Sequence, residues 1–235
     1  MRLLLCVMLL SSLAKAQTCV IAIKTKDAIY VGADSKVLTP VYNNLTHRWD
    51  SVFSMTCKIG HHGNFNFAVV GNLGEINKAA ASKSILTATN SKQLIGNYIE
   101  EFKKNALLKM DSISKFNYSI FNSIYSINQP FAYCIFFGLE NDTLFLKTMA
   151  FIRTENIGGN LSIAPAYLEY DTLALGHATE IYDMKMFDKP STWSKGNISA
   201  IKSLIKLSEK YNPLNVGGEI NILEVTRKRT LWKQP

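Results

Sequence analysis

The sequence predicts an α+β domain in which two antiparallel sheets lie face to face with helices on their outer sides. Three observations lead to this fold class. Short β-branched and apolar segments occur in pairs joined by short turns, which is typical of antiparallel hairpins. Apolar residues recur at helix-like spacings in two later regions. Blocks of strands and helices therefore alternate along the chain, and this order favours sheets covered by helices.

The first sixteen residues have the layout of a secretory signal peptide. Met1 and Arg2 give a positive start, the apolar run LLLCVMLLSSLA follows, and Ala14-Lys15-Ala16 is a small-x-small cleavage pattern. The run is too short to span a bilayer. We expect residues 1–16 to be removed and the protein to be secreted or periplasmic; a buried helix and an uncleaved anchor are the alternatives. Residues 17–235 are expected to form a single domain without a membrane span.

The first half of the mature chain is predicted to contain two pairs of strands. TCVIAIK (residues 18–24) and AIYVGA (28–33) form the first hairpin. Their continuous apolarity predicts burial on both faces. Residues 37–51 are polar and turn-prone, and we expect a loop there. SVFSMTCKIG (51–60) and FNFAVVG (65–71) form the second pair.

Helices and strands then alternate to the end of the chain. A helical pattern runs from Glu75 to about Lys109, with a break near TNSKQ, where Ser91 is the expected cap of a second helix. The remaining predicted elements are a hairpin of FAYCIFFGLE and TLFLKTMAF, one strand in AYLEYDTLALG, helices in ATEIYDMKMF and ISAIKSLIKLSEKY, and a last strand in GEINILEVTR.

The positive charge of the chain does not predict a nucleic-acid binder. The formal net charge is +8, and removal of residues 1–16 takes away two basic residues and no acid, which leaves +6. The lysines are scattered, and the densest cluster is Arg227-Lys228-Arg229. Nucleic-acid binding tends to show a basic stripe with interleaved aromatic residues. We interpret the charge as solvation, with weak attraction to acidic surfaces.

The cysteines and histidines do not form a metal or disulfide pattern. Cys19, Cys57 and Cys134 remain after the leader, and an odd count without a close pair is neither a disulfide framework nor a zinc site. Cys19 and Cys134 lie in apolar strands and are expected in the core. His61 and His62 are adjacent, and adjacent residues of a strand point to opposite faces. Because no third ligand is visible, we expect a histidine pair in a loop and no bound metal.

Thr18 opens the first predicted strand directly after the leader. An N-terminal threonine is a nucleophile whose own amine can act as its general base. A nearby lysine ammonium would lower the pKa of that amine and of the hydroxyl, and an aspartate would hold the lysine in place. Backbone N–H groups at a glycine turn would stabilise the oxyanion. This chemistry requires proteolysis immediately before Thr18.

The chain carries an ordered set of motifs that fits this chemistry. Thr18 begins TCVIAIK, Asp34 follows sixteen residues later in GADSK, Lys58 stands in CKIG, and Gly71 stands in AVVGNLGE before a long helix. NVGGEINILEV supplies a late strand after Gly-Gly. From Thr18 to roughly Thr226 the chain resembles the β-subunits of proteasomes and related bacterial proteasome-like peptidases, which are N-terminal-nucleophile hydrolases.

The resemblance implies a fold, a reaction and roles for single residues. The fold would be a four-layer αββα sandwich, and the activity that of a threonine-type endopeptidase. Thr18 would be the nucleophile, Lys58 would tune its pKa, Asp34 would hold Lys58, and Gly71 would donate an oxyanion N–H. The family implies peptide substrates, a homo-oligomer such as a ring, and no metal or organic cofactor. Ser35, beside Asp34 in GADSK, is a candidate for a supporting role.

Some positions depart from the family pattern. Gly176-His177-Ala178 stands where the family has Gly-Ser-Gly, so His177 replaces a serine and is a candidate supporting proton carrier. Pro213 and Val216 stand where the family has aspartate and serine before Gly-Gly. These departures favour an inactive scaffold for assembly or binding, and the superfamily also contains small-molecule amide hydrolases. Signal peptidase would leave Gln17 ahead of Thr18, so Gln17 must be lost before the amine can act.

Plainer interpretations exist for each residue of this set. Thr18 could be an ordinary strand residue, because threonine is common in strands. Asp34 could end a strand, Lys58 could be a solvated lysine, and Gly71 could be a turn glycine. The four residues taken together, at the family's order and spacing, favour the catalytic interpretation.

Overall fold

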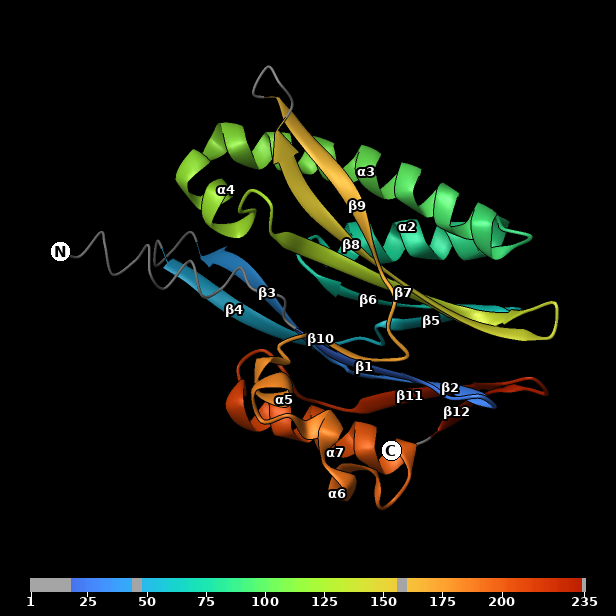
Figure 1. Cartoon of the computed structure of the whole chain (residues 1–235). Coiled ribbons are helices and arrows are strands. Elements are labelled where there is room, and N and C mark those ends of the chain that lie inside the picture. Colours follow the sequence, from blue (N-terminus) through green and yellow to red (C-terminus); the bar gives the residue numbers. More distant parts are fainter. Residues whose placement is uncertain (1–17, 44–47, 156–159, 234–235) are drawn as a thin grey trace. The chain divides into compact units, whose positions relative to one another are not determined.

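The computed structural model describes residues 18–43, 48–155 and 160–233 (Figure 1). The chain divides into two compact units. We name them the terminal unit, which spans residues 17–59 and 171–235, and the central unit, which spans residues 60–170. The expected signal peptide and Gln17 lie outside the described residues, so their removal stays a prediction.

The terminal unit is built on a five-stranded antiparallel sheet in the order β10-β1-β2-β11-β12. Its strands are β1 (Cys19–Lys24), β2 (Ala28–Asp34), β10 (Thr172–Gly176), β11 (Ile220–Thr226) and β12 (Thr230–Lys233). The expected first hairpin is confirmed, since β1 pairs with β2. Nearly every side chain of these two strands is buried, as their continuous apolarity predicted. Strand β12 was not predicted.

Helix α7 (Asn197–Tyr211) lies along one face of this sheet (Figure 1). Ile201, Leu204 and Ile205 share one side of the helix because they are three and four residues apart. They belong to one buried cluster with Cys19 and other residues of the sheet. A Cβ atom on Gly32 of β2 would lie 2.3 Å from Cγ2 of Ile201, so only glycine allows this close approach of the helix.

The helix expected over residues 178–187 is shorter than predicted. Helix α5 (Thr179–Asp183) ends early, and a 3₁₀ turn, η1 (Met186–Asp188), follows it. Lys185 between them has a φ of 50°, which is left-handed and cannot continue an α-helix. A one-turn helix, α6 (Pro190–Trp193), precedes α7 and was not predicted.

The loop expected over residues 37–51 was wrong for the part that the structure describes, residues 37–43 and 48–51. β3 (Lys36–Asn43) and β4 (Arg48–Met55) form a separate two-stranded antiparallel sheet. Its backbone register runs from Lys36 opposite Met55 to Asn43 opposite Arg48. A ladder of this kind depends on backbone hydrogen bonds, and the turn-prone Pro40 and Asn43 between apolar residues concealed it from an argument based on apolar runs.

The central unit contains a second five-stranded sheet, in the order β5-β6-β7-β8-β9. Its strands are β5 (Ile59–His62), β6 (Phe65–Gly71), β7 (Pro130–Glu140), β8 (Thr143–Glu155) and β9 (Leu161–Leu168). The predicted hairpin of β7 and β8 is confirmed. AYLEYDTLALG is not one strand: β9 ends at Leu168, β10 begins at Thr172, and the polar residues between them mark the passage from one sheet to the other.

Three helices follow β6 in the central unit: α2 (Gly74–Thr87), α3 (Ser91–Phe116) and α4 (Tyr118–Ile124). The predicted break is confirmed, but Asn90 caps α3 and accepts a hydrogen bond from the N–H of Gln93, in place of Ser91. The ring of Phe102 lies 4.2 Å from the ring of Phe151 on β8, and Tyr98 meets Phe136 edge-on. These aromatic contacts fix α3 on the central sheet.

The predicted fold class is confirmed in its coarser form, as a mixed structure with antiparallel sheets and helices. Each unit places its helices against its own five-stranded sheet (Figure 1). Within the described residues, no helix has the length and apolarity needed to cross a membrane.

Candidate active site

The carboxylate of Asp34 connects three separate segments of the terminal unit through hydrogen bonds. Asp34 is the last residue of β2 and is fully buried. Its Oδ1 accepts hydrogen bonds from the backbone N–H of Cys19 at 2.8 Å and from Nζ of Lys58 at 3.1 Å. Its Oδ2 accepts from Nζ of Lys58 at 3.1 Å and from the N–H of Gly217 at 3.2 Å. A buried carboxylate needs such partners, and each oxygen of Asp34 accepts two hydrogen bonds.

Lys58 is buried as well, with an exposed fraction of 5%. It lies between β4 and β5, and its ammonium also donates to the backbone carbonyl of Lys36 at 2.6 Å. The ammonium of Lys58 therefore bridges the carboxylate of Asp34 and the backbone carbonyl of Lys36, which follows Asp34 by two residues. The plainer interpretation of Lys58 as a solvated surface lysine does not fit this burial.

Burial shifts the pKa values of both partners. It lowers the pKa of Lys58 below 10.5, and the negative charge of Asp34 opposes that shift. It raises the pKa of Asp34 above 3.8, and the charge of Lys58 and the N–H groups of Cys19 and Gly217 oppose that shift. Desolvation disfavours the charged form of each group, so the two pKa values move toward each other.

Thr18 is one peptide bond away from this pair. The carbonyl of Thr18 accepts a hydrogen bond from the N–H of His177 at 2.9 Å, and the next N–H, that of Cys19, donates to Asp34. The peptide group between Thr18 and Cys19 is thus held from both of its edges. Thr18 is 6% exposed. The strand register places Thr18 at the same end of the sheet as Asp34, because Val20 lies opposite Ala33.

The two supporting candidates of the sequence also lie in the terminal unit. Ser35 is buried, its Oγ accepts from the N–H of Glu219 at 2.9 Å, and it contacts Sδ of Met55 at 3.4 Å. His177 contributes backbone groups, since its N–H binds Thr18 and its carbonyl accepts from the hydroxyl of the buried Ser208. A proton-carrier role for the imidazole of His177 stays a prediction.

Gly217 is a site residue whose contact was not predicted. Its N–H donates to Asp34, and its carbonyl accepts from the N–H of Lys36 at 3.1 Å. Gly217 and Gly218 have φ values of +153° and +78°, in a region that favours glycine. The Gly-Gly pair in the sequence indicated an unusual backbone at this position. It could not indicate the contact with Asp34, because the donor is a backbone N–H, which every residue except proline carries.

The two positions that depart from the family pattern have other contacts in this chain. Val216 is fully buried in the cluster beneath α7. The carbonyl of Pro213 accepts a hydrogen bond from Nζ of Lys36 at 2.6 Å. Both positions therefore hold the segment before β11 in place, and neither brings a carboxylate or a hydroxyl.

Gly71 ends β6 in the central unit. Its φ is +103°, and an added Cβ would lie 2.6 Å from the carbonyl oxygen of Phe131. A glycine is therefore required at this position for backbone reasons alone. Its unit differs from that of Thr18, so the role of Gly71 as an oxyanion donor stays a prediction.

The cysteines lie where the sequence predicts, but the loop expected for His61 and His62 is wrong, because both belong to strand β5. Cys19 and Cys134 are free thiols, and their predicted burial is confirmed, while Sγ of Cys57 contacts the carbonyl of Ile59 at 3.2 Å. Burial raises the pKa of the Cys19 thiol to about 12. Nδ1 of His61 lies 2.6 Å from Oδ1 of Asn66. In the part of the chain that the structure describes, no three histidine, cysteine or acidic side chains gather as a metal site would require.

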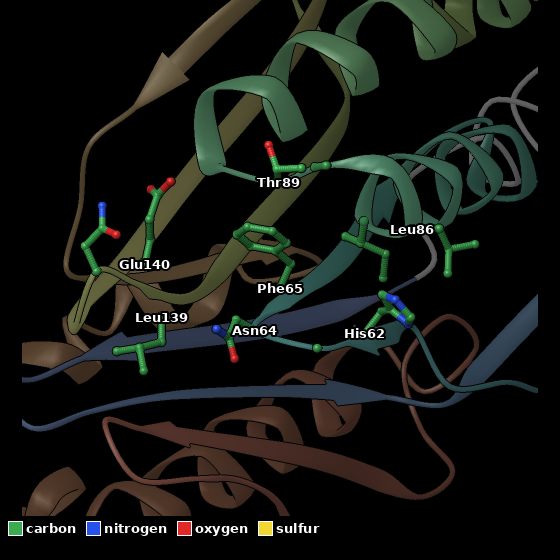
Figure 2. A pocket seen from close by; sticks show the side chains of 11 residues that line it. His62, Asn64, Phe65, Leu86, Thr89, Leu139 and Glu140 are labelled. Carbon is green, nitrogen blue, oxygen red and sulfur yellow. The ribbon is translucent and has the colours of Figure 1, made fainter.

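A separate cavity of about 330 Å³ lies in the central unit (Figure 2). Its lining includes His62, Phe65, Leu86 and Glu140, and none of the predicted catalytic residues. Figure 2 shows Glu140 beside the start of α3, and its carboxylate already accepts from the N–H and the hydroxyl of Ser91, at 3.0 and 2.5 Å. The one charged group of this cavity thus caps a helix, and we do not assign a reaction to it.

A buried ammonium–carboxylate pair close to the residue that precedes a strand can lower the pKa of a neighbouring amine and position a nucleophile. Comparison with known proteins adds no assignment, since no protein-family model and no curated protein matches the sequence.

Proposed function

We propose that the protein is a threonine-type N-terminal-nucleophile hydrolase that cleaves amide bonds. One observation carries this proposal: the carboxylate of Asp34 binds both the ammonium of Lys58 and the N–H of the peptide that follows Thr18. The carboxylate and the ammonium that the mechanism requires thereby lie one peptide bond from Thr18, which directly precedes β1. The order of these residues in the sequence supports the same proposal.

In this mechanism the free amine of Thr18 takes the proton of its own hydroxyl, directly or through a water molecule. The hydroxyl oxygen attacks the carbonyl carbon of an amide, and an N–H such as that of Gly71 stabilises the oxyanion. The intermediate expels the amine product after proton transfer and leaves an ester on Thr18. Water then hydrolyses the ester. The ammonium of Lys58 keeps the amine of Thr18 in its neutral, basic form by lowering its pKa.

The proposal includes a fold and an assembly. The two five-stranded antiparallel sheets, each with its own helices, support a four-layer αββα sandwich. Peptides are the proposed substrates, and a homo-oligomeric ring is the proposed assembly. A monomer of the same chemistry would instead fit a hydrolase of small amides. The mechanism requires no metal or organic cofactor, and residues 1–16 would direct the chain to a secreted or periplasmic location.

A second candidate function is a non-catalytic scaffold for assembly or binding. Val216 and the exposed Pro213 favour it, because they bring no polar side chain to positions where the related peptidases have an aspartate and a serine. Side chains around catalytic groups hold them in productive geometry, so the loss of two such groups lowers the expected rate.

The N-terminus of the mature protein decides between the two candidates. Intact mass and N-terminal sequencing of the secreted protein should show a chain that begins at Thr18. A chain that begins at Gln17 and keeps that residue has no free threonine amine, and this result would exclude the amine-base mechanism.

A chain that begins at Thr18 should react with an electrophilic probe for N-terminal threonine, such as a peptide epoxyketone. Thr18→Ser should keep labelling, because serine retains the hydroxyl, whereas Thr18→Ala should abolish it. Lys58→Met should slow labelling strongly while leaving the N-terminus unchanged. Full labelling of Lys58→Met would remove Lys58 from the mechanism, and no labelling of the wild-type protein would favour the scaffold.

A further inference from the structure

Two turns of the terminal sheet lie together at the end opposite Thr18. β2 pairs with β11 from Asp34 opposite Ile220 to Ala28 opposite Thr226. The turn after β1, residues 25–27, therefore lies beside the turn after β11, residues 227–229. Any ligand bound at these turns would be separated from the candidate active site by the length of β2.

The second of these turns displays three cations on an ordered backbone. The Oγ1 of Thr226 accepts from the N–H groups of Lys228 and Arg229 at 3.3 and 3.1 Å, and it donates to the carbonyl of Arg229 at 3.0 Å. The N–H of Thr226 donates to the same carbonyl at 2.9 Å. Arg227, Lys228 and Arg229 are all exposed. Their charges are thus presented by a turn that is already fixed.

Positive charge is in excess at this end of the sheet. Lys24 and Lys26 add two cations, and Asp27, Asp171 and Glu224 are acidic residues at or near the same end. Lys24 lies 3.8 Å from Asp171, in a pair that is largely exposed. Among the ion pairs of the described residues, none involves the three cations of residues 227–229.

An exposed aromatic side chain stands on the strand that follows the cations. Trp232 of β12 is 45% exposed and lies opposite Leu223 of β11, three residues after Arg229. Nζ of its neighbour Lys233 lies 2.5 Å from the carboxylate of Glu224, so an ion pair joins β12 to β11 beside it. Tryptophan favours the interface between water and lipid, because its ring is apolar and its N–H remains polar. A cation cluster with one exposed tryptophan matches a headgroup surface better than the long basic stripe of a nucleic-acid binder.

We propose that this basic end of the terminal sheet, formed by Lys24, Lys26 and residues 227–229, docks on an anionic phospholipid surface together with Trp232 of the adjoining strand β12. The cations contact lipid phosphates, and Trp232 enters the headgroup layer. The attraction is electrostatic and reversible, so salt weakens it. Docking leaves the end of the sheet that carries Thr18 and Asp34 directed away from the lipid. This inference does not depend on catalysis.

Vesicle co-sedimentation tests the proposal with the full-length mature protein. Vesicles of phosphatidylcholine mixed with phosphatidylglycerol should bind the protein at low salt, and vesicles of phosphatidylcholine alone should not. Each basic residue near an anionic surface contributes about a fivefold increase in binding. The triple variant Arg227→Gln/Lys228→Gln/Arg229→Gln should therefore bind about a hundredfold more weakly.

A charge-matched control is available in the same unit. The variant Lys185→Gln/Lys189→Gln/Lys195→Gln removes three exposed lysines before α7 and should change vesicle binding by less than about threefold. Trp232→Gln should weaken binding without changing its dependence on salt. Unchanged thermal unfolding shows that each variant is folded.

Three outcomes would overturn the proposal. The first is equal binding to neutral and anionic vesicles, and the second is equal loss of binding in the control and in the triple variant of residues 227–229. The third is retention on immobilised heparin combined with no binding to anionic vesicles, which would assign the basic end to an acidic polysaccharide.

Discussion

The ammonium of Lys58 donates to both carboxylate oxygens of Asp34, at 3.1 Å each, and both side chains are almost completely buried. Taking two charges out of water has a large energetic cost, which their attraction only partly offsets. An ion pair in this position is therefore better explained by a role in the site than by stability. The attraction between the two charges and the energetic cost of burying either one alone should both be measurable.

Removal of one partner should destabilise the protein much more than removal of both. We expect Asp34→Asn or Lys58→Met to lower the free energy of unfolding by about 3–5 kcal/mol, because each leaves one uncompensated buried charge. The double variant should lose far less than the sum of the two single losses. Urea unfolding of the four proteins measures this coupling, and additive losses would show that the two side chains do not form a pair in solution.

The same pair should leave a signature in the dependence of stability on pH. Below pH 3.8 Asp34 is protonated in both the folded and the unfolded protein. Between pH 3.8 and the raised pKa of the folded protein, only the folded protein keeps this proton, so the free energy of unfolding falls as pH rises. The lowered pKa of Lys58 has the opposite effect: between its folded pKa and 10.5 the unfolded state binds more protons, so stability rises with pH.

We therefore compare the free energy of unfolding of the wild type with that of the double variant Asp34→Asn/Lys58→Met. The wild type should be least stable relative to this variant at pH values between the folded pKa of Asp34 and the folded pKa of Lys58. Urea unfolding across the pH range measures that difference and removes the contribution of other acids. A difference that does not change with pH would mean that burial shifts neither pKa.

Gly71 should tolerate no side chain. Gly71→Ala combines a left-handed φ of +103° with an approach of 2.6 Å to the carbonyl of Phe131, so we expect a loss of about 2–4 kcal/mol in unfolding free energy. Gly74→Ala is the matched control, because nothing lies within 4 Å of an added Cβ. That control should change stability by less than about 1 kcal/mol, measured by urea unfolding. Equal losses would contradict the strained geometry at Gly71.

The thiols should differ sharply in reactivity. Thiolate is the reactive form, and burial raises the pKa of Cys19 to about 12 and that of Cys134 well above its usual value. We expect neither Cys19 nor Cys134 to react with iodoacetamide at pH 8 in the folded protein, whereas the half-buried Cys57 should react slowly. Peptide mass spectrometry after timed alkylation gives the rate at each cysteine. Fast labelling of Cys19 would show that β1 opens in solution.

Much of the secondary structure followed from local pattern. The hairpins of β1 with β2 and of β7 with β8, and the helices α3 and α7, have apolar periodicities long enough to be read in one segment. The β3–β4 hairpin was missed because turn-prone residues such as Pro40 and Asn43 interrupt its apolar residues. The border between β9 and β10 was missed because apolar residues lie on both sides of a short break. Pairing partners, rather than composition, define those strands.

The sequence by itself determined which residues could act as a nucleophile, a cation and its counter-charge, because Thr18, Asp34 and Lys58 are marked by residue type and spacing. Only the tertiary structure decided that Asp34 and Lys58 form a buried pair. It also supplied the backbone groups that complete the site: the N–H groups of Cys19 and Gly217 and the carbonyl of Lys36. Backbone donors and acceptors are the same at every residue, so their partners depend on where the chain folds and leave no mark in the sequence.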